Sequence, residues 1–492
     1  MSDNGKARQF FSQTVIYGLG IMLNRSVSFI LIPVYTKYFL PAELGIFTLV
    51  QSLSIFLGFV YAFGLETAFM KKFIDAEDEN RKKNIYSSTL MFLLLSSTVL
   101  SFVIYLSAGR MASAIGIQDS PNGVNLIRLM SIVMIADTLY RIPMLLFRAR
   151  LQAMTYSLLN LLAFIINVVL NLVLIVRLGL GVEAIFYSYL VSVVVILIVT
   201  LFMTRRVLTV SFSKQTLSEL LGYGAKFIFI GIFLLIIDMS DRFFLQYYFG
   251  ESSVGIYWAN YRLASAMGLV IAAFRFSWTP FFLNLSEKQA SKKIIADVTV
   301  YFVFAGSLLF ITFGLLIDLL APAEIFGIRF LDALYLPGLG IVPIILLSYF
   351  FSGLYSTFNA APFFTDNTRS LLYVTISGVV LNLALNFLLI PKYEMHGAAA
   401  ATLITYLAMF IMVFIYSQKI YRIELDYLKI AVMFFVALIF FAAGYFGINR
   451  MNMSLQVKCI ADVGLVLLYI AVLNVTDTFQ LSKLTSLIKK KN

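Results

Sequence analysis

Three charged residues interrupt an apolar stretch that is long enough to cross a membrane. The stretch runs from about Phe227 to Phe249 and includes LLIIDMSDRFFL, which holds Asp238, Asp241 and Arg242. A run of this length is typical of a membrane-spanning helix. Each charge at the centre of such a helix costs about 2.5–3.5 kcal/mol. The cost requires a compensating role, and an acid that faces water or a ligand inside a membrane can carry a proton or a sodium ion.

Two roles remain open for these residues. Asp238 and Arg242 lie four residues apart, which is the spacing of an ion pair on one helix face. Once one carboxylate has paired with the arginine, a second remains, and two acids so close do not both stay ionised cheaply in a low dielectric. We therefore expect an ion-coupling or gating site at Asp238, Asp241 and Arg242. The alternative is that all three only tie their helix to its neighbours.

Other arginines have no acid nearby on their own helix. Arg25 lies beside Asn24 near the middle of the first apolar stretch, and Arg275 is equally isolated along its helix. Tyr257, Tyr261 and Arg275 fall near one face, and such an aromatic and cationic stripe favours a polar cavity over lipid. Arginines in a cavity need an anionic partner, and phosphate suits the planar guanidinium. The predicted cavity residues are Asn24, Arg25, Tyr257, Tyr261, Arg262 and Arg275.

One further pair of intramembrane charges has a simpler interpretation. Asp137 and Arg141 also lie four residues apart in an apolar stretch. We expect them to neutralise each other on one helix face.

The composition indicates an integral membrane protein. Of the 492 residues, 61% are hydrophobic and 13% are charged, against about 45–50% and 25% in soluble proteins. A single cysteine, Cys459, excludes an internal disulfide framework. No cleavable signal peptide is expected, because Met1–Gln9 is polar and the first apolar run is a full span.

Apolar stretches predict about fourteen transmembrane helices with short connections. They lie near residues 14–36, 44–66, 85–107, 124–147, 153–176, 183–203, 222–245, 254–280, 295–320, 335–360, 370–390, 397–417, 428–447 and 457–476.

The distribution of lysine and arginine predicts the orientation. With a cytoplasmic N-terminus, 23 of the 37 basic residues fall in cytoplasmic segments and 7 on the opposite side. By the positive-inside rule, both termini are expected in the cytoplasm. This bias explains most of the net charge of +12 without a nucleic-acid partner. The C-terminal FQLSKLTSLIKKK is expected to lie as a helix in the cytoplasmic interface.

The chain repeats itself at a spacing of about 210–215 residues. Paired asparagines inside membrane helices are rare, yet Asn167 and Asn171 recur as Asn382 and Asn386. The repeated segments are YFLPAELGIF (38–47) with YFGESSVGIY (248–257), and NVVLNLVLIV (167–176) with NLALNFLLIP (382–391).

A duplicated unit of six helices enters the membrane the same way in both copies, which makes the repeat parallel. We therefore predict an all-α integral membrane protein with two parallel six-helix lobes around a central cavity. The predicted parts are residues 1–210, 211–425 and 426–492, the last being two extra helices and a cytoplasmic tail.

The segments FFSQTVIYGLG…LIPVYTKYFLPAELGIF and NLALNFLLIPKYEMHGAAAATL, with the layout of six, six and two helices, carry a family resemblance. Over nearly its whole length the chain resembles the bacterial polysaccharide (O-antigen, Wzx-type) flippases of the multidrug/oligosaccharidyl-lipid/polysaccharide exporter superfamily. The resemblance implies a protein of the cytoplasmic membrane that is not an enzyme. It implies transfer of undecaprenyl-pyrophosphate-linked oligosaccharide repeat units to the periplasm by alternating access, for O-antigen, capsule or exopolysaccharide synthesis.

The same resemblance implies the partners: an anionic polyprenyl-pyrophosphate-linked glycan, the lipid bilayer and, as a candidate, the polysaccharide polymerase machinery. In the related lipid II flippases the last two helices form a groove for the lipid tail, and the helices at 428–447 and 457–476 could do likewise. No cofactor or metal is expected, and coupling to a gradient of H⁺ or Na⁺ is a hypothesis.

Three alternatives stay open. A lipid II-type flippase would share the layout. A cation-coupled multidrug exporter of the same superfamily would usually stop at twelve helices and favour an acidic cavity, whereas arginine exceeds acid among the buried charges here. A membrane enzyme would need a large catalytic loop outside the cytoplasm, and the longest such connections, near 108–123 and 321–334, are too short for a domain.

Overall fold

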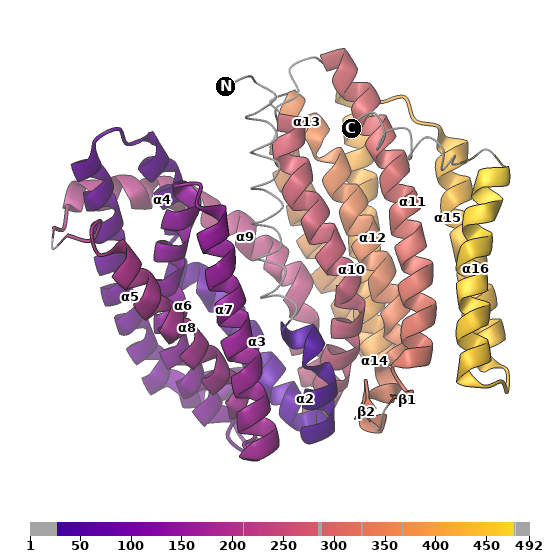
Figure 1. The fold of residues 1–492 in the computed structure, drawn as a ribbon, viewed down its shortest axis with the longest axis horizontal. Coiled ribbons are helices and arrows are strands. Elements are labelled where there is room, and N and C mark those ends of the chain that lie inside the picture. The colour runs from indigo at the N-terminus through magenta and orange to yellow at the C-terminus, as the bar shows by residue number, and fades with distance from the viewer. Residues whose placement is uncertain are drawn as a thin grey trace. The chain divides into compact units, whose positions relative to one another are not determined.

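The computed structural model describes residues 27–209, 211–283, 288–325, 328–365, 369–476 and 478 (Figure 1). Asn24, Arg25 and the predicted interfacial helix at the C-terminus lie outside the described residues. The described chain divides into two compact units. The first contains the residues up to Trp258 together with Asn386–Glu394, and the second contains Ala259–Leu385 and the residues from Met395 onward.

The first unit is built from helices. They are α2 (Ile32–Tyr38), α3 (Pro41–Ala62), α4 (Leu65–Asp75), α5 (Glu79–Ala114), α6 (Gly123–Ala149), α7 (Ala153–Asn171), the π-helical η1 (Leu172–Arg177), α8 (Glu183–Thr204), α9 (Lys214–Phe249) and the start of α10 (Glu251–Leu283).

The second unit continues α10 and adds one small hairpin, in which β1 (Glu324–Ile325) pairs antiparallel with β2 (Ile328–Arg329). Its other elements are α11 (Lys288–Leu320), the 3-10 helix η2 (Ala333–Ile341), α12 (Val342–Phe358), α13 (Ala360–Phe364), most of α14 (Arg369–Ile420), α15 (Tyr427–Ala442), the π-helical η3 (Ala443–Gly447), the 3-10 helix η4 (Ile448–Arg450) and α16 (Leu455–Val475).

The all-α fold predicted from the sequence is confirmed. Every predicted membrane segment from residue 44 onward coincides with helix, and the described end of the first segment is also helical. The segments at 370–390 and 397–417 form the two halves of α14, which bends at Glu394 (φ 49°, ψ −126°). In the described part of the chain, ten helical stretches are long and apolar enough to cross a membrane. The boundaries of the two six-helix lobes remain a prediction. The two compact units are defined by packing, and their limits do not test the sequence repeat.

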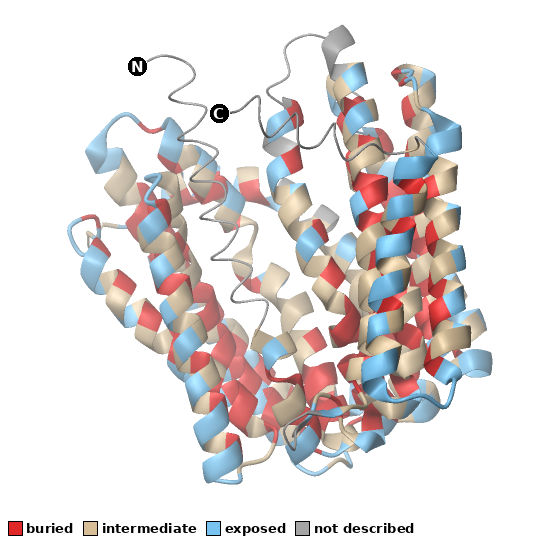
Figure 2. Cartoon of the chain, turned by 45° about the vertical axis from the view of Figure 1, so that its right-hand side comes forward, coloured by how far each residue is buried: buried red, intermediate tan, exposed pale blue. Residues whose placement is uncertain are grey.

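Burial on these helices follows the pattern of a protein surrounded by lipid (Figure 2). On α5 the exposed side chains include Leu95 and Leu106, each 68% exposed, whereas Ser87, Ser88 and Ser97 are completely buried. Small polar residues let membrane helices approach closely and hydrogen-bond, while apolar side chains cover the outer face. The pattern of α5 is therefore that of a membrane helix packed on one side.

Polar caps fix several helix starts. Asp78 accepts a hydrogen bond from the backbone N–H of Arg81 at the start of α5, and Ser454 accepts one from Val457 at the start of α16. Such caps satisfy backbone donors that have no partner within the helix.

The repeated asparagines hold helices together within the units. Asn171 accepts a hydrogen bond from the Tyr35 hydroxyl at 3.0 Å and donates to Asn167 Oδ1 at 2.7 Å. In the later segment, Asn382 donates to Thr405 at 3.3 Å and Asn386 to Ser240 at 3.2 Å. All four asparagines are buried. The asparagine spacing that the two segments share thus allows buried hydrogen bonds to form, and the loss of such bonds is costly.

Candidate functional site

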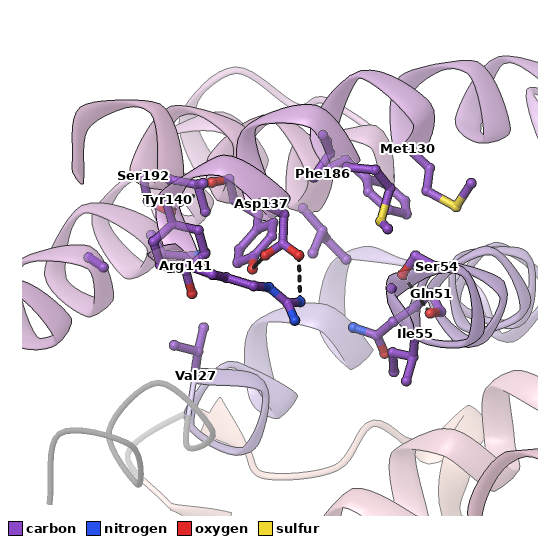
Figure 3. A pocket seen from close by; sticks show the side chains of 18 of the residues that line it. Val27, Gln51, Ser54, Ile55, Met130, Asp137, Tyr140, Arg141, Phe186 and Ser192 are labelled. Atoms are coloured by element: carbon purple, nitrogen blue, oxygen red, sulfur yellow. Dashed lines mark hydrogen bonds and ion pairs between the residues drawn. The ribbon is translucent and has the colours of Figure 1, made fainter. Parts of the chain in front are cut away.

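The first unit encloses a pocket of about 570 Å³. Its wall is formed mainly by α3, α4, α6, α7 and α8. Figure 3 shows lining side chains from α3, α6 and α8. Pockets for small molecules occupy roughly 300–1,000 Å³. The size of this pocket therefore suits a ligand.

Arg141 of α6 is the centre of a charged cluster in this pocket. Its guanidinium forms ion pairs with Asp137, one turn away, at 2.6 Å and with Glu66 of α4 at 2.9 Å. Tyr189 of α8 donates a hydrogen bond to the second Asp137 oxygen at 2.5 Å. Figure 3 shows the Arg141 side chain extending into the pocket beside Asp137. One cation is thus shared by two carboxylates, and the ionised cluster has one net negative charge.

A break between α3 and α4 positions Glu66. Phe63 and Gly64 adopt left-handed backbone conformations, with φ of 49° and 67°. A Cβ on Gly64 would lie 2.1 Å from the carbonyl oxygen of Gly224 on α9, so the close approach requires glycine. The break places Glu66 in the first turn of α4, where the helix N-terminus favours an acid.

Uncharged polar groups and aromatic rings form much of the remaining wall. Gln51 and Ser54 come from α3, Tyr140 from α6, and Phe186 and Ser192 from α8 (Figure 3). Amides and hydroxyls can donate and accept hydrogen bonds, and aromatic rings add apolar surface at low entropic cost. This lining suits a molecule that carries many hydroxyl groups.

The predicted coupling residues lie on α9 in the same unit, and two of them form a buried ion pair. Arg242 Nη1 lies 2.8 Å from Asp241 Oδ1, and both side chains are almost completely buried. The Tyr257 hydroxyl of α10 donates to Asp241 Oδ2 at 2.5 Å. Asp238 accepts from Arg242 through its backbone carbonyl, also at 2.5 Å. The structure therefore brings Asp241, Arg242 and Tyr257 together, and a coupling role for the group remains a prediction.

The other described cavity candidates lie on α10 in the second unit. The Tyr261 ring contacts Tyr349 of α12, with 6.2 Å between ring centroids. Arg275 donates to the backbone carbonyl of Ser352 at 2.9 Å and to its hydroxyl at 2.5 Å. Arg262 is half-buried between them along the helix. Within this unit Tyr261 and Arg275 thus face α12, and their predicted part in a substrate cavity is still to be tested.

Sequence reasoning missed the main pocket residues. The predicted Asp137–Arg141 ion pair is confirmed, and it lines a pocket that the spacing along α6 alone does not indicate. The sequence patterns also do not indicate Glu66, Gln51 or Tyr189 as pocket residues. The available signal was an acid at the end of an apolar stretch, directly after a glycine, in FGLETAF. Its partner on α6 follows only from the packing of the helices.

The chain matches a family of known sequences. The family described as polysaccharide biosynthesis protein matches residues 34–326, which is more than half of the chain. The comparison with curated proteins gave no match.

Solved structures of low sequence identity share the fold. The structure of the lipid II flippase MurJ in an inward closed conformation has a TM-score of 0.71 and 15% identity, and the match covers 95% of this chain and 98% of that one. An inward-facing multidrug resistance MATE family transporter of the MOP superfamily has a TM-score of 0.63 and 14% identity, over 82% and 94% of the two chains. The Vibrio cholerae MATE transporter VcmN in its bent form has a TM-score of 0.53 and 14% identity, over 85% and 98%. These likenesses show that the chain has the same fold as these proteins.

Proposed function

Because the chain belongs to the polysaccharide biosynthesis protein family, we propose that it is a flippase for lipid-linked oligosaccharides. The proposed substrate is an undecaprenyl-pyrophosphate-linked repeat unit for O-antigen, capsule or exopolysaccharide. In this proposal the protein lies in the bacterial cytoplasmic membrane and works by alternating access. The polysaccharide polymerase machinery is the proposed partner that receives the translocated unit.

The pocket of the first unit is the observation that carries this proposal. It combines a ligand-sized volume with amides, hydroxyls, aromatic rings and a charged cluster. Sugars present many hydroxyl groups, which such a wall can bind. Among the described residues that line the pocket, Arg141 is the only arginine, and Glu66 and Asp137 already share it, so we assign the pocket to the glycan rather than to the pyrophosphate. The predicted pyrophosphate ligands remain Arg25 and Arg275.

A second candidate is favoured by the charge of the same pocket. The charged residues that line it in the described part of the chain are two acids and one arginine, whereas the sequence indicates an excess of arginine over acid among the buried charges. An acidic pocket suits cationic amphiphiles, as a multidrug exporter would require. A lipid II-type substrate is a third option, since its lipid pyrophosphate and sugars have the same chemistry.

Reconstituted vesicles distinguish these substrates. The purified protein is incorporated with an undecaprenyl-pyrophosphate-linked oligosaccharide, with lipid II, or with a fluorescent cationic drug, and transbilayer transfer is followed over time. We expect transfer of the oligosaccharide lipid and not of the drug. In cells, depletion of the protein should lead the same lipid-linked oligosaccharide to accumulate on the cytoplasmic face. Transfer of the drug alone would refute the flippase proposal.

A further inference from the structure

Two buried aspartates lie where α11, α16 and the end of α15 meet. Asp318 is two residues from the end of α11 and is 7% exposed, and Asp462 lies about two turns into α16 and is 1% exposed. Asn449 of η4, 5% exposed, donates from Nδ2 to Asp318 Oδ2 at 3.3 Å. The Asn449 side chain also lies within hydrogen-bonding reach of Asp462, and the Asp318 carboxylate repels the Asp462 carboxylate electrostatically. Three elements therefore direct oxygen-bearing side chains to one place within the second unit.

Several of these oxygens have no hydrogen bond of regular geometry. Both carboxylate oxygens of Asp462 and the Oδ1 atom of Asn449 are buried, and no donor approaches them with the distance and angle of a well-formed hydrogen bond. A buried polar atom without a partner costs about 1–3 kcal/mol, and an unpaired buried charge costs more. Three such atoms at one site indicate that a donor or a cation belongs there.

The neighbouring basic side chains do not neutralise Asp462. Arg450 forms an ion pair with Asp318 Oδ1 at 3.4 Å, is 55% exposed, and lies over the Tyr445 ring at 4.8 Å. Lys458 is one turn before Asp462 on α16, but its ammonium donates to the backbone carbonyl of Asn449 at 2.9 Å. Neither forms an ion pair with Asp462.

The backbone beside Asp462 is irregular. The α-helical part of α15 gives way to the π-helical η3 and then to the 3-10 helix η4. A Cβ on Gly444 of η3 would lie 3.1 Å from Asp462 Oδ1, so this backbone passes close to the carboxylate. Single π-helical turns often occur at functional sites. Helix C-terminal ends and unwound carbonyls in membrane proteins carry the negative partial charge that coordinates small cations.

We propose that Asp318, Asn449 and Asp462 form a binding site for a sodium ion. Carboxylate and amide oxygens are hard ligands that suit such a cation. Because Asp318 is already paired with Arg450, the Asp462 carboxylate is the charge left to balance, and a monovalent cation balances it. The bound ion links α11 to α15 and α16. These last two helices come after the predicted six-helix repeats in the chain.

Thermal unfolding of the purified protein tests the site. Melting is measured as NaCl replaces choline chloride at constant ionic strength, and the binding of radioactive sodium is measured in parallel. Sodium should raise the Tm of the wild type by about 2–4 °C. Asp462→Asn and Asp318→Asn should abolish both the rise and the radioactive binding. Asp426→Asn is the matched control, because it removes an acid at the exposed start of α15, and it should keep the response.

The measured quantity is the change in Tm that sodium causes, and the Tm in the absence of sodium is only the reference. Asp462→Asn removes a buried charge and can stabilise the fold, yet it should still lose the response to sodium. An equal Tm rise in wild type and Asp462→Asn would overturn the proposal. So would equal effects of sodium and choline, or a Tm that follows pH alone, which would assign a proton to Asp462. Neither measurement requires transport, so the outcome is independent of the proposed flippase function.

Discussion

Arg141 is the residue on which the pocket cluster depends. It neutralises Asp137 and Glu66 together, so Arg141→Ala leaves two carboxylates facing each other. We expect transport of the oligosaccharide lipid to fall at least about tenfold, because loss of one charge-assisted contact of about 1.4 kcal/mol corresponds to tenfold. Arg141→Lys should restore part of the rate, since it keeps the charge but not the two-pronged geometry.

Initial transfer rates in vesicles measure this effect. Arg128→Ala is the matched control, because Arg128 lies on the same helix and is exposed. Unfolding should show a loss of about 1–3 kcal/mol for Arg141→Ala, because the Asp137 side chain is only 8% exposed and loses the cation that neutralises it. The Glu66 pair adds little, since the Arg141 and Glu66 side chains are 38% and 40% exposed and solvent weakens their interaction. Equal transport by the two alanine variants would remove Arg141 from the site.

Asp238 and Asp241 should respond differently to Asp→Asn. Asp241→Asn removes the carboxylate that pairs with the buried Arg242 at 2.8 Å and should destabilise the protein by about 3–5 kcal/mol. Asp238→Asn keeps the backbone carbonyl that Arg242 uses. Under the coupling hypothesis, Asp238→Asn still binds substrate but loses its dependence on a gradient of H⁺ or Na⁺ in vesicles. Normal transport with unchanged ion dependence in both variants would mean that the three residues only join helices.

The spacing of residues along one helix predicts a side-chain pair only where no residue of another helix binds one of the partners. Asp137 and Arg141 pair across one turn as expected. The same spacing did not choose between Asp238 and Asp241, because Tyr257 on α10 holds the Asp241 carboxylate. Glu66 could not be predicted from spacing, because its partner Arg141 lies on another helix, 75 positions further along the chain.

At the scale of helices, α3 approaches the start of α10 backbone to backbone. A Cβ on Gly45 would lie 1.9 Å from the carbonyl oxygen of Glu251. Gly45→Ala must therefore push the two helices apart, and overpacking of this kind costs about 1–3 kcal/mol. Thermal unfolding in detergent measures the loss. Gly109→Ala on α5 meets no atom within 4 Å and should leave the Tm unchanged or raise it slightly. Equal Tm values for the two variants would contradict the close contact.

The start of α15 depends on Asp426. Its carboxylate accepts from the backbone N–H of Lys429 and pairs with the Lys429 ammonium at 3.1 Å, which lowers the pKa of Asp426. Asp426→Ala should cost about 0.5–2 kcal/mol at neutral pH. Because the folded pKa is the lower one, this stabilisation is present above the ordinary carboxylate pKa and disappears as the pH falls through the folded value. Unfolding at pH 7 and pH 3 should show the difference from wild type shrink in acid, whereas an equal difference at both would exclude the ionised cap.

Helix positions could be predicted more closely than helix ends and breaks. The predicted segment at 428–447 matches the start of α15 within one residue, because the apolar run begins at its cap. Helix α9 instead begins at Lys214, well before the apolar stretch at 222, since a polar segment continues the helix beyond it. The break at Phe63 and Gly64 was not predicted either, because it depends on the close approach of Gly224.

For the whole molecule, composition and apolar periodicity were sufficient to predict the fold class, because lipid admits only a few architectures. The family resemblance is confirmed by the match over residues 34–326. The chemistry of the pocket could not be predicted in the same way. It combines α3, α4, α6 and α8, and the pairing of side chains from separate helices is not encoded in the spacing of any one of them.

The orientation in the membrane is the prediction that governs the direction of transport. Lysine and arginine gather on one set of connections, and such segments stay in the cytoplasm during insertion. The native Cys459 is first replaced by serine, so that labelling reports single introduced cysteines. Gly109→Cys and Ser252→Cys, both at exposed positions, should react with a membrane-impermeant maleimide in intact spheroplasts. Glu77→Cys is also exposed and should react only after the membrane is permeabilised. Because all three positions are exposed, differences in reaction reflect the side of the membrane rather than burial. The reverse pattern would invert the topology, and the proposed export of oligosaccharide units to the periplasm would then lose its direction.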